Sequence, residues 1–297
     1  MKYALIIAGI LIVLGCALFV TALASNNWDI TTLNNNRYQS NTYSIDKTFQ
    51  NIAIDTDTAD ISLVLTEDDT CRVVCYESEK LTYSVHAKDG TLTISSKDGR
   101  KWYEYITFFS FGAPKITLYL PQGEYNTLNI TGSTGIVDIP KDFQFAGANI
   151  RLSTGNIKYC ASVQQDVMLR TSTGHIAVDG ITVGDLSVTV STGKVTLTNV
   201  QCQNLQSEGD TGDLQLENVI ASGKFSIERS TGDITLDRCD AAEIEIETDT
   251  GDVSGNLLSP KIFLTETDTG RVNVSKSTTG GRCQIETDTG NIKITTP

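Results

Sequence analysis

Residues 186–197 read LSVTVSTGKVTL, and the turn at the centre of this stretch recurs through two thirds of the chain. Ser-Thr-Gly or Asp-Thr-Gly occurs nine times, with the glycine at Gly135, Gly155, Gly174, Gly193, Gly212, Gly232, Gly251, Gly270 and Gly290. Successive glycines are always 19 or 20 residues apart. A fixed period of this length indicates a solenoid, in which each repeat forms one coil.

Apolar and polar residues alternate on both sides of each turn. Leu186 and Val188 precede Gly193, and Val195 follows it by two positions. This period of two is typical of strands and not of helices. We therefore predict an all-β fold, a single-rod parallel β-solenoid of about eleven coils, each with two short strands. The turn glycine is expected to have a positive φ.

The same offsets continue towards the N-terminus with less regularity. Ile52 and Ile54 precede Ala59, and Tyr83 precedes Gly90, at the spacing found in the later coils. The solenoid domain is therefore predicted to cover residues 46–297, with irregular coils at 46–120 and regular coils at 121–297. Residues 25–45 are polar and rich in asparagine, which is typical of a stalk.

The N-terminal segment is long and apolar. Residues 3–24 carry no charge, Lys2 precedes them and Asp29 follows. About 20 apolar residues can span a bilayer. We therefore predict a transmembrane signal anchor at 1–24, and the flanking charges favour a single-pass membrane protein with residues 25–297 outside the cytoplasm.

Two other interpretations of this segment stay open. Signal peptidase could cut after residues 22–24, which read Ala-Leu-Ala. Residues 13–16 resemble the lipidation site of bacterial lipoproteins, with Cys16 as the modified residue. All three interpretations place the remainder of the chain outside the cytoplasm.

The net charge of the chain and the motifs that it lacks argue against several classes of function. Asp and Glu total 36 against 23 Lys and Arg, and a net charge of -13 argues against a nucleic-acid partner. His86 and His175 are isolated, and no G-x-S-x-G elbow, phosphate loop or histidine-containing metal motif is present. Carboxylates recur in every coil, whereas an active site is built once. We predict a non-enzymatic protein without a cofactor; a polysaccharide-active β-helix enzyme is the alternative.

The cysteines are expected to be buried free thiols. Cys71 and Cys75 are four residues apart in an expected strand, a separation of ~13 Å that a disulfide cannot bridge. Cys283 falls at an inward position of its coil. Free cysteine behaves as a small apolar residue in protein cores.

An acidic stripe follows the later coils, four and two positions before the glycine. Its candidate calcium ligands are Glu208, Asp210, Glu247, Asp249, Glu266, Asp268, Glu286 and Asp288. Stacked coils would place like carboxylates ~4.8 Å apart. Either solvent and salt screen this exposed ladder, or calcium bridges oxygens of successive coils.

Residues 100–111 interrupt the repeat and are rich in aromatic residues. Trp102, Tyr103, Phe108 and Phe109 are candidate contacts to a membrane or a partner protein, because aromatic residues concentrate at interfaces. The alternative is a cap that covers one end of the solenoid core.

An N-terminal anchor followed by S/D-T-G coils resembles the putative-adhesin family of bacterial envelope β-solenoids, over about residues 45–297. The resemblance implies an envelope location and supplies no catalytic residues. It favours an adhesin-like binding or scaffolding module whose partner is an envelope protein or a glycan. An accessory sensor of cell-envelope stress is the alternative function that it implies.

The oligomeric state is predicted from the last coil. Residues 291–294 are expected to leave an unpaired strand edge, which Lys293 and Pro297 blunt. The expected state is a monomer.

Overall fold

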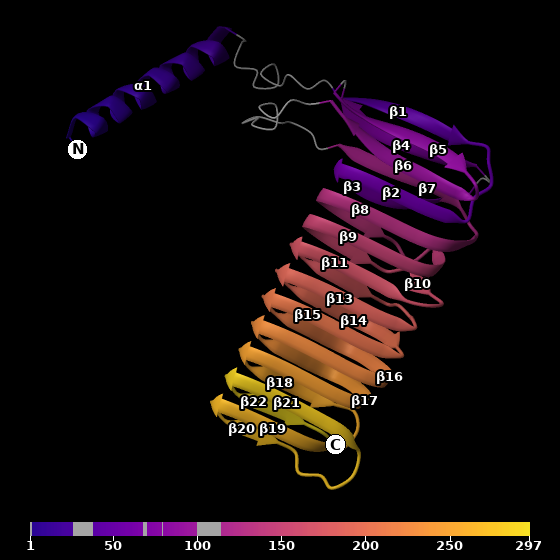
Figure 1. Cartoon of the computed structure of the whole chain (residues 1–297), viewed down its shortest axis with the longest axis vertical. Coiled ribbons are helices and arrows are strands. Elements are labelled where there is room, and N and C mark those ends of the chain that lie inside the picture. Colours follow the sequence, from indigo (N-terminus) through magenta and orange to yellow (C-terminus); the bar gives the residue numbers. More distant parts are fainter. Residues whose placement is uncertain (1, 26–37, 68–69, 79, 100–113) are drawn as a thin grey trace.

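The computed structural model describes residues 2–25, 38–67, 70–78, 80–99 and 114–297. Helix α1 (Lys2–Ser25) precedes one continuous sheet of 22 strands, which form an elongated rod (Figure 1). The N-terminal strands are β1 (Tyr38–Ile45), β2 (Asn51–Thr58), β3 (Asp60–Thr66), β4 (Cys71–Ser78), β5 (Leu81–Lys88), β6 (Thr91–Asp98) and β7 (Lys115–Pro121).

The remaining strands build the body and the C-terminal end of the rod. They are β8 (Glu124–Ile139), β9 (Gln144–Tyr159), β10 (Ser162–Val163), β11 (Val167–Thr173), β12 (Ile176–Asp179), β13 (Asp185–Thr192), β14 (Val195–Cys202), β15 (Asn204–Thr211), β16 (Leu214–Thr231), β17 (Ile234–Thr250), β18 (Val253–Leu257), β19 (Lys261–Thr269), β20 (Val272–Val274), β21 (Gly281–Thr289) and β22 (Ile292–Thr295).

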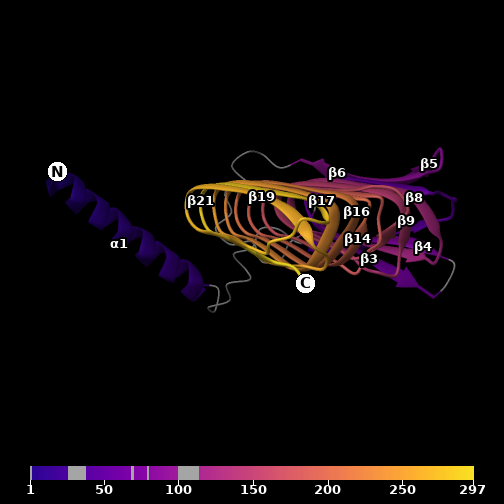
Figure 2. The ribbon, with the colours of Figure 1, turned by 90° about the horizontal axis from the view of Figure 1, so that it is seen from below.

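The coils stack as a solenoid of about nine turns. In each coil, one strand segment precedes the S/D-T-G turn and another follows it. The segments that precede the turns form the first face of the rod, and the segments that follow the turns form the second face. Viewed along the rod, successive coils overlie one another as a flattened tube (Figure 2). On the second face Ile176 pairs with Val195, Val195 with Leu214, and Leu214 with Ile234, all fully buried. The interior positions therefore lie mostly where the glycine offsets predicted them; the exceptions are Val272 and Leu258, which are 43% and 46% exposed.

The S/D-T-G turns stack backbone on backbone. Seven of the nine turn glycines have φ between 127° and 157°, which confirms the expected positive φ at those positions. At Gly193 a Cβ atom would lie 1.8 Å from the carbonyl oxygen of Gly174 in the preceding coil. Glycine is therefore required here both by conformation and by close approach.

The N-terminal end differs from the prediction. Gly90, expected to be a coil turn, lies instead in the antiparallel β5–β6 hairpin, where Asp89 has φ 50° and Gly90 has φ 75°. Strand β4 runs antiparallel to β7, and β1 runs antiparallel to β4. Residues 38–45, predicted as stalk, therefore form an edge strand. The antiparallel strands extend the sheet beyond the first coils, so fewer than eleven regular coils remain.

The order of the coils at the C-terminal end also corrects the prediction. Strand β21 pairs with β17 on one side and β19 on the other, so residues 281–295 insert between two coils that precede them in sequence. The inserted coil buries Cys283 and Ile285 completely, whereas Phe263 of the outer coil is only partly buried. The more apolar coil thus lies inside, and the terminal edge belongs to β19 and β20, not to residues 291–294.

The N-terminal segment forms α1 over Lys2–Ser25. Judged on the described residues, no helix combines the length and apolar character that a membrane crossing requires. The transmembrane anchor at 1–24 stays a prediction from the sequence.

Buried thiols occupy interior positions, as expected. Cys71, Cys75, Cys202, Cys239 and Cys283 are buried, whereas Cys160 is only partly buried, and all the cysteines are free. Desolvation, followed by the nearby carboxylate of Glu77, raises the pKa of Cys75 to about 12. Desolvation also raises the pKa of Cys239 to about 11 and that of Cys283 to about 12.

These thiols predict a loss of stability at alkaline pH. In the unfolded chain a thiol ionises near pH ~8.5, so between about pH 9 and 12 the unfolded state binds fewer protons than the folded state. The free energy of unfolding should be constant with respect to these groups below pH 8 and fall as pH rises towards 12. Urea titrations at several pH values measure the slope. The Cys239→Ala/Cys283→Ala variant should show a shallower slope, and equal slopes would contradict this account.

Candidate functional site

A groove of about 700 Å³ runs along the third side of the rod, where loops connect the second face to the first face of the next coil. Its lining residues come from β9, β10, β14, β16 and the intervening loops. They are Gln144, Phe145, Ser162, Val163, Gln164, Thr182, Val183, Gly184, Gln201, Cys202, Gln203 and Ser222. No charged residue is among them, although the protein carries a net charge of -13.

The floor of the groove is apolar and its backbone is already paired. Phe145, Val163, Val183 and Cys202 are all buried, on successive coils. The amide of Val163 donates to the carbonyl of Thr182 at 3.1 Å, and the amide of Val183 donates to that of Gln201 at 2.9 Å. The floor therefore offers a narrow apolar surface, because its side chains are only 1–7% exposed, and few free backbone groups.

The rim of the groove consists of polar, uncharged side chains. Gln144, Gln164, Gln201 and Gln203 are exposed. Within the described part of the chain, their side-chain amides take part in no hydrogen bond. An amide side chain both donates and accepts hydrogen bonds. The rim can therefore bind a ligand rich in groups that do the same.

The groove does not present an activated nucleophile. Cys202 lies in its floor, and desolvation, with a smaller contribution from Asp185, raises the pKa of the thiol to about 12. A thiol with such a pKa is protonated at neutral pH, and the thiolate is the reactive form. The chemistry of the lining therefore favours binding.

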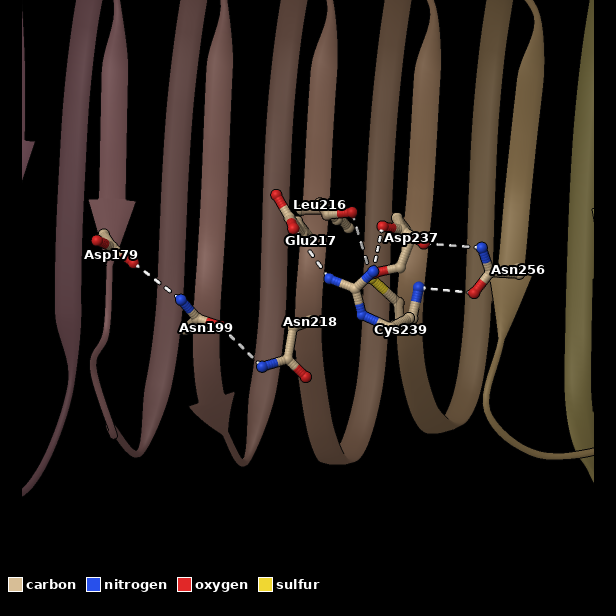
Figure 3. A network of polar contacts seen from close by, with 9 residues as sticks. Asp179, Asn199, Leu216, Glu217, Asn218, Asp237, Cys239 and Asn256 are labelled. Carbon is tan, nitrogen blue, oxygen red and sulfur yellow. Dashed lines mark hydrogen bonds and ion pairs between the residues drawn. The ribbon is translucent and has the colours of Figure 1, made fainter.

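The corner at the end of the second face, two residues before Gln201 of the groove, is stabilised by hydrogen bonds within the protein (Figure 3). Asn199 and Asn218 have φ near 54° and form a chain in which Asn218 donates to Asn199 at 2.8 Å, and Asn199 donates to Asp179 at 3.3 Å. Arg238, also at positive φ, contacts Glu217 at 2.9 Å. These polar side chains are satisfied internally, in contrast to the groove rim.

The acids that follow the turn glycines also have structural roles. Asp213 accepts a hydrogen bond from the amide of Asp233 at 3.1 Å, and Asp233 accepts one from the amide of Asp252 at 2.9 Å. Asp252 in turn accepts from the amide of Asn291 at 2.7 Å. These carboxylates link successive coils.

Six of the eight predicted calcium ligands lie on three neighbouring coils, in a different order from the sequence, whereas the coil of Glu228 separates Glu208 from Glu247. Glu247 pairs with Glu286, and Glu286 pairs with Glu266, because residues 281–295 are inserted. Among the described residues, no group of three or more His, Cys, Asp or Glu side chains is arranged to hold a metal ion. Calcium binding by the ladder stays a prediction.

Trp102, Tyr103, Phe108 and Phe109 lie outside the described residues, so their predicted interface role also stays a prediction. The groove, by contrast, was not predicted. Its signal in the sequence is a set of Gln, Ser and Thr residues in the loops between coils, free of charge.

Comparison with known proteins identifies the family. Residues 49–295 match the model of the Toastrack DUF4097 family. The chain belongs to this family. The match, together with the putative adhesin from Parabacteroides merdae described below, confirms the resemblance to the putative-adhesin family. No curated protein matches the chain.

Several solved structures are similar to this chain at low sequence identity, and the first of them shares its fold. A putative adhesin from Parabacteroides merdae ATCC 43184 is 12% identical with a TM-score of 0.53, covering 88% of this chain and 97% of that chain. A putative adhesin from Bacteroides fragilis NCTC 9343 is 16% identical, with a TM-score of 0.38 and coverage of 87% and 97%. A protein described as a putative lipid binding protein, from Parabacteroides distasonis ATCC 8503, is 14% identical, with a TM-score of 0.39 and the same coverage.

Proposed function

We propose that this Toastrack DUF4097 protein is a non-enzymatic, adhesin-like binding module that holds its ligand in the groove on the third side of the rod. The observation that carries this proposal is the rim, where exposed glutamine amides, which have no hydrogen-bond partner among the described residues, surround a buried apolar floor. Ligand sites combine an apolar lining with a few convergent polar groups in this way. The naming of structural relatives as adhesins agrees with a binding role.

We further propose that the module is held at the cell membrane by residues 1–24, with the solenoid outside the cytoplasm. The support is the run of 22 residues without charge at positions 3–24 and the basic Lys2 before it. A rigid rod attached in this way would hold the groove at a fixed position for a ligand in the envelope.

Blocking the groove should abolish ligand retention without unfolding the rod. Ser222 is exposed at the groove, so Ser222→Trp places a bulky ring in the binding space while leaving the core unchanged. Retention of the full chain, in detergent, on isolated envelope material should fall by more than about tenfold, equivalent to ~1.4 kcal/mol of binding free energy.

The matched control is Ser226→Trp, which adds the same ring at an exposed position of β16 on the first face. Both variants should keep the wild-type melting temperature. Equal retention of the two variants would show that the groove is not the binding site.

A further inference from the structure

We propose that the groove binds an uncharged linear polysaccharide that lies along the rod axis, with one sugar ring for each coil. This inference rests on the proposed function of the groove and specifies its ligand. It follows from the spacing of the coils, the chemistry of the rim and floor, and the charge around them.

The first step is the spacing. Ser162 pairs with Gln144, and Thr182 pairs with Gln201, so the rim residues stand on neighbouring coils. Adjacent parallel strands are ~4.8 Å apart, which is close to the length of one hexopyranose in a linear chain. A polysaccharide along the rod would therefore meet an equivalent position at every coil.

The second step is the repeated pairing of a polar rim with an apolar floor. In each of four successive coils, a polar residue of the rim is followed directly by a buried residue of the floor. The pairs are Gln144 and Phe145, Ser162 and Val163, Thr182 and Val183, and Gln201 and Cys202. A sugar ring has an apolar face of C–H groups and a periphery of hydroxyls. The floor matches the ring face, and the rim matches the periphery.

The third step is hydrogen-bond chemistry. Gln164 and Gln203 add two further amides along the edge nearer the first face, and neither has a hydrogen-bond partner among the described side chains and backbone groups. Sugar hydroxyls donate and accept at the same atom, and glutamine amides carry both functions on one side chain. A ligand group that only accepts hydrogen bonds, such as a carboxylate, would use the N–H donors of the glutamine amides but not their carbonyl acceptors.

Charge and backbone pairing exclude the main alternatives. Asp166 and Asp185 lie beside the groove, where the amide of Asp185 donates to Asp166 at 3.1 Å, and the protein as a whole is strongly acidic. Both features disfavour an anionic polymer. An extended peptide binds by adding a strand to a free edge, and the amides of Val163, Val183 and Gln203 in the groove are already bonded to neighbouring coils.

The test uses full-length protein in detergent and two uncharged probe series, β-1,4-linked gluco-oligosaccharides and manno-oligosaccharides from dimer to octamer, with oligogalacturonate as the acidic probe. Calorimetry should show that the affinity for at least one uncharged series rises with each added ring up to about the tetramer, because the rim and floor pairs span four coils, and then levels off. Oligogalacturonate should bind more weakly than the uncharged oligomer of equal length.

A variant pair tests the role of the amides. Gln164→Ala/Gln203→Ala should lower the affinity for the tetramer by about 5- to 50-fold, since each neutral hydrogen bond contributes roughly two- to tenfold. Gln215→Ala, which removes an exposed glutamine on the second face, should leave the affinity unchanged.

Tighter binding of oligogalacturonate, an affinity independent of length, or no effect of the double variant would each overturn the proposed ligand. If neither uncharged series binds while Ser222→Trp still abolishes retention on envelope material, the ligand class is wrong and the groove function stands. If Ser222→Trp leaves retention intact, the proposed function itself fails.

Discussion

The variant Gly193→Ala should lower the free energy of unfolding by about 1–3 kcal/mol, and Gly193→Val by more, because two independent constraints act at this turn. Gly193 has φ 142°, a region that residues with a Cβ rarely adopt. The added Cβ would also lie 1.8 Å from the carbonyl oxygen of Gly174, which is backbone and cannot rotate away. Relief would require the two coils to separate. That movement would strain the hydrogen bond from the amide of Gly174 to Thr192, 2.9 Å long.

Chemical denaturation of the full chain measures this effect, with Gly123→Ala as the matched control. No atom lies within 4 Å of the Cβ position of Gly123, which is exposed. The control substitution should change the stability by less than ~0.5 kcal/mol. If Gly193→Ala is no more destabilising than Gly123→Ala, the close stacking of the turns is wrong.

The sequence was sufficient to predict the cross-section of the rod. The turn at Gly193 and its copies fix the phase of each coil, so the residue two positions after the glycine is buried in eight of the nine coils; the exception is Val272 in the terminal coil, which is 43% exposed. Val195 and Ile234 illustrate this, since both were assigned to the interior by offset alone and both are fully buried. Side chains alternate between the two faces of a strand, so once the turn fixes the position of one residue, it also determines which residues of that strand are buried.

The order of the coils could not be predicted in the same way. Residues 247–251, 266–270 and 286–290 all read ETDTG, so the local pattern gives no preference for which coil lies next to which. The order depends on how much apolar surface each coil buries. Cys283 and Ile285 form a better interior layer than Phe263 and Thr265. The hairpin at Gly90 was missed for a related reason, because its alternation suits antiparallel strands equally well.

The groove was not predicted because its residues lie mostly in the loops, where equivalent residues do not recur at a constant distance from the turn glycine. Gln164 lies nine residues after Gly155, whereas Gln203 lies ten residues after Gly193, although the next turn glycine follows 19 residues later in both coils. Gln164 and Gln203 therefore do not align when the coils are compared by offset. Stacking brings them to the same edge of the groove.

Three departures from the repeat meet at one place in the core. Ser207 occupies a row that holds Val188 and Ile227 in the neighbouring coils, and it is fully buried. The Arg229 side chain, 2% exposed, donates to the Oγ of Ser207 at 2.9 Å. Gly209 makes room for it, since a Cβ there would lie 1.6 Å from the Nη1 atom of Arg229.

In this arrangement, few hydrogen bonds offset the free-energy cost of burying the charged guanidinium of Arg229. The Nε atom of Arg229 is buried and has no hydrogen-bond partner in the part of the chain that the structure describes. Desolvation lowers the pKa of the guanidinium to about 10, although Asp210 opposes the shift. Burying a charge is costly unless hydrogen bonds and an opposite charge offset it.

We therefore expect Ser207→Ala to lower the free energy of unfolding by about 1.5–3 kcal/mol, the range for a hydrogen bond to a charged group. Ser207→Ala/Arg229→Met should instead be as stable as wild type or more stable by ~1–4 kcal/mol, because an apolar side chain replaces the buried charge. Urea denaturation of wild type, both single variants and the double variant forms a double-mutant cycle. If the double variant is less stable than Ser207→Ala alone, Arg229 contributes to stability through contacts other than Ser207. If the changes in unfolding free energy of the two single variants add up to that of the double variant, the hydrogen bond between these side chains does not determine the stability loss caused by either substitution. The cycle therefore separates the hydrogen bond of Arg229 from the cost of burying its charge.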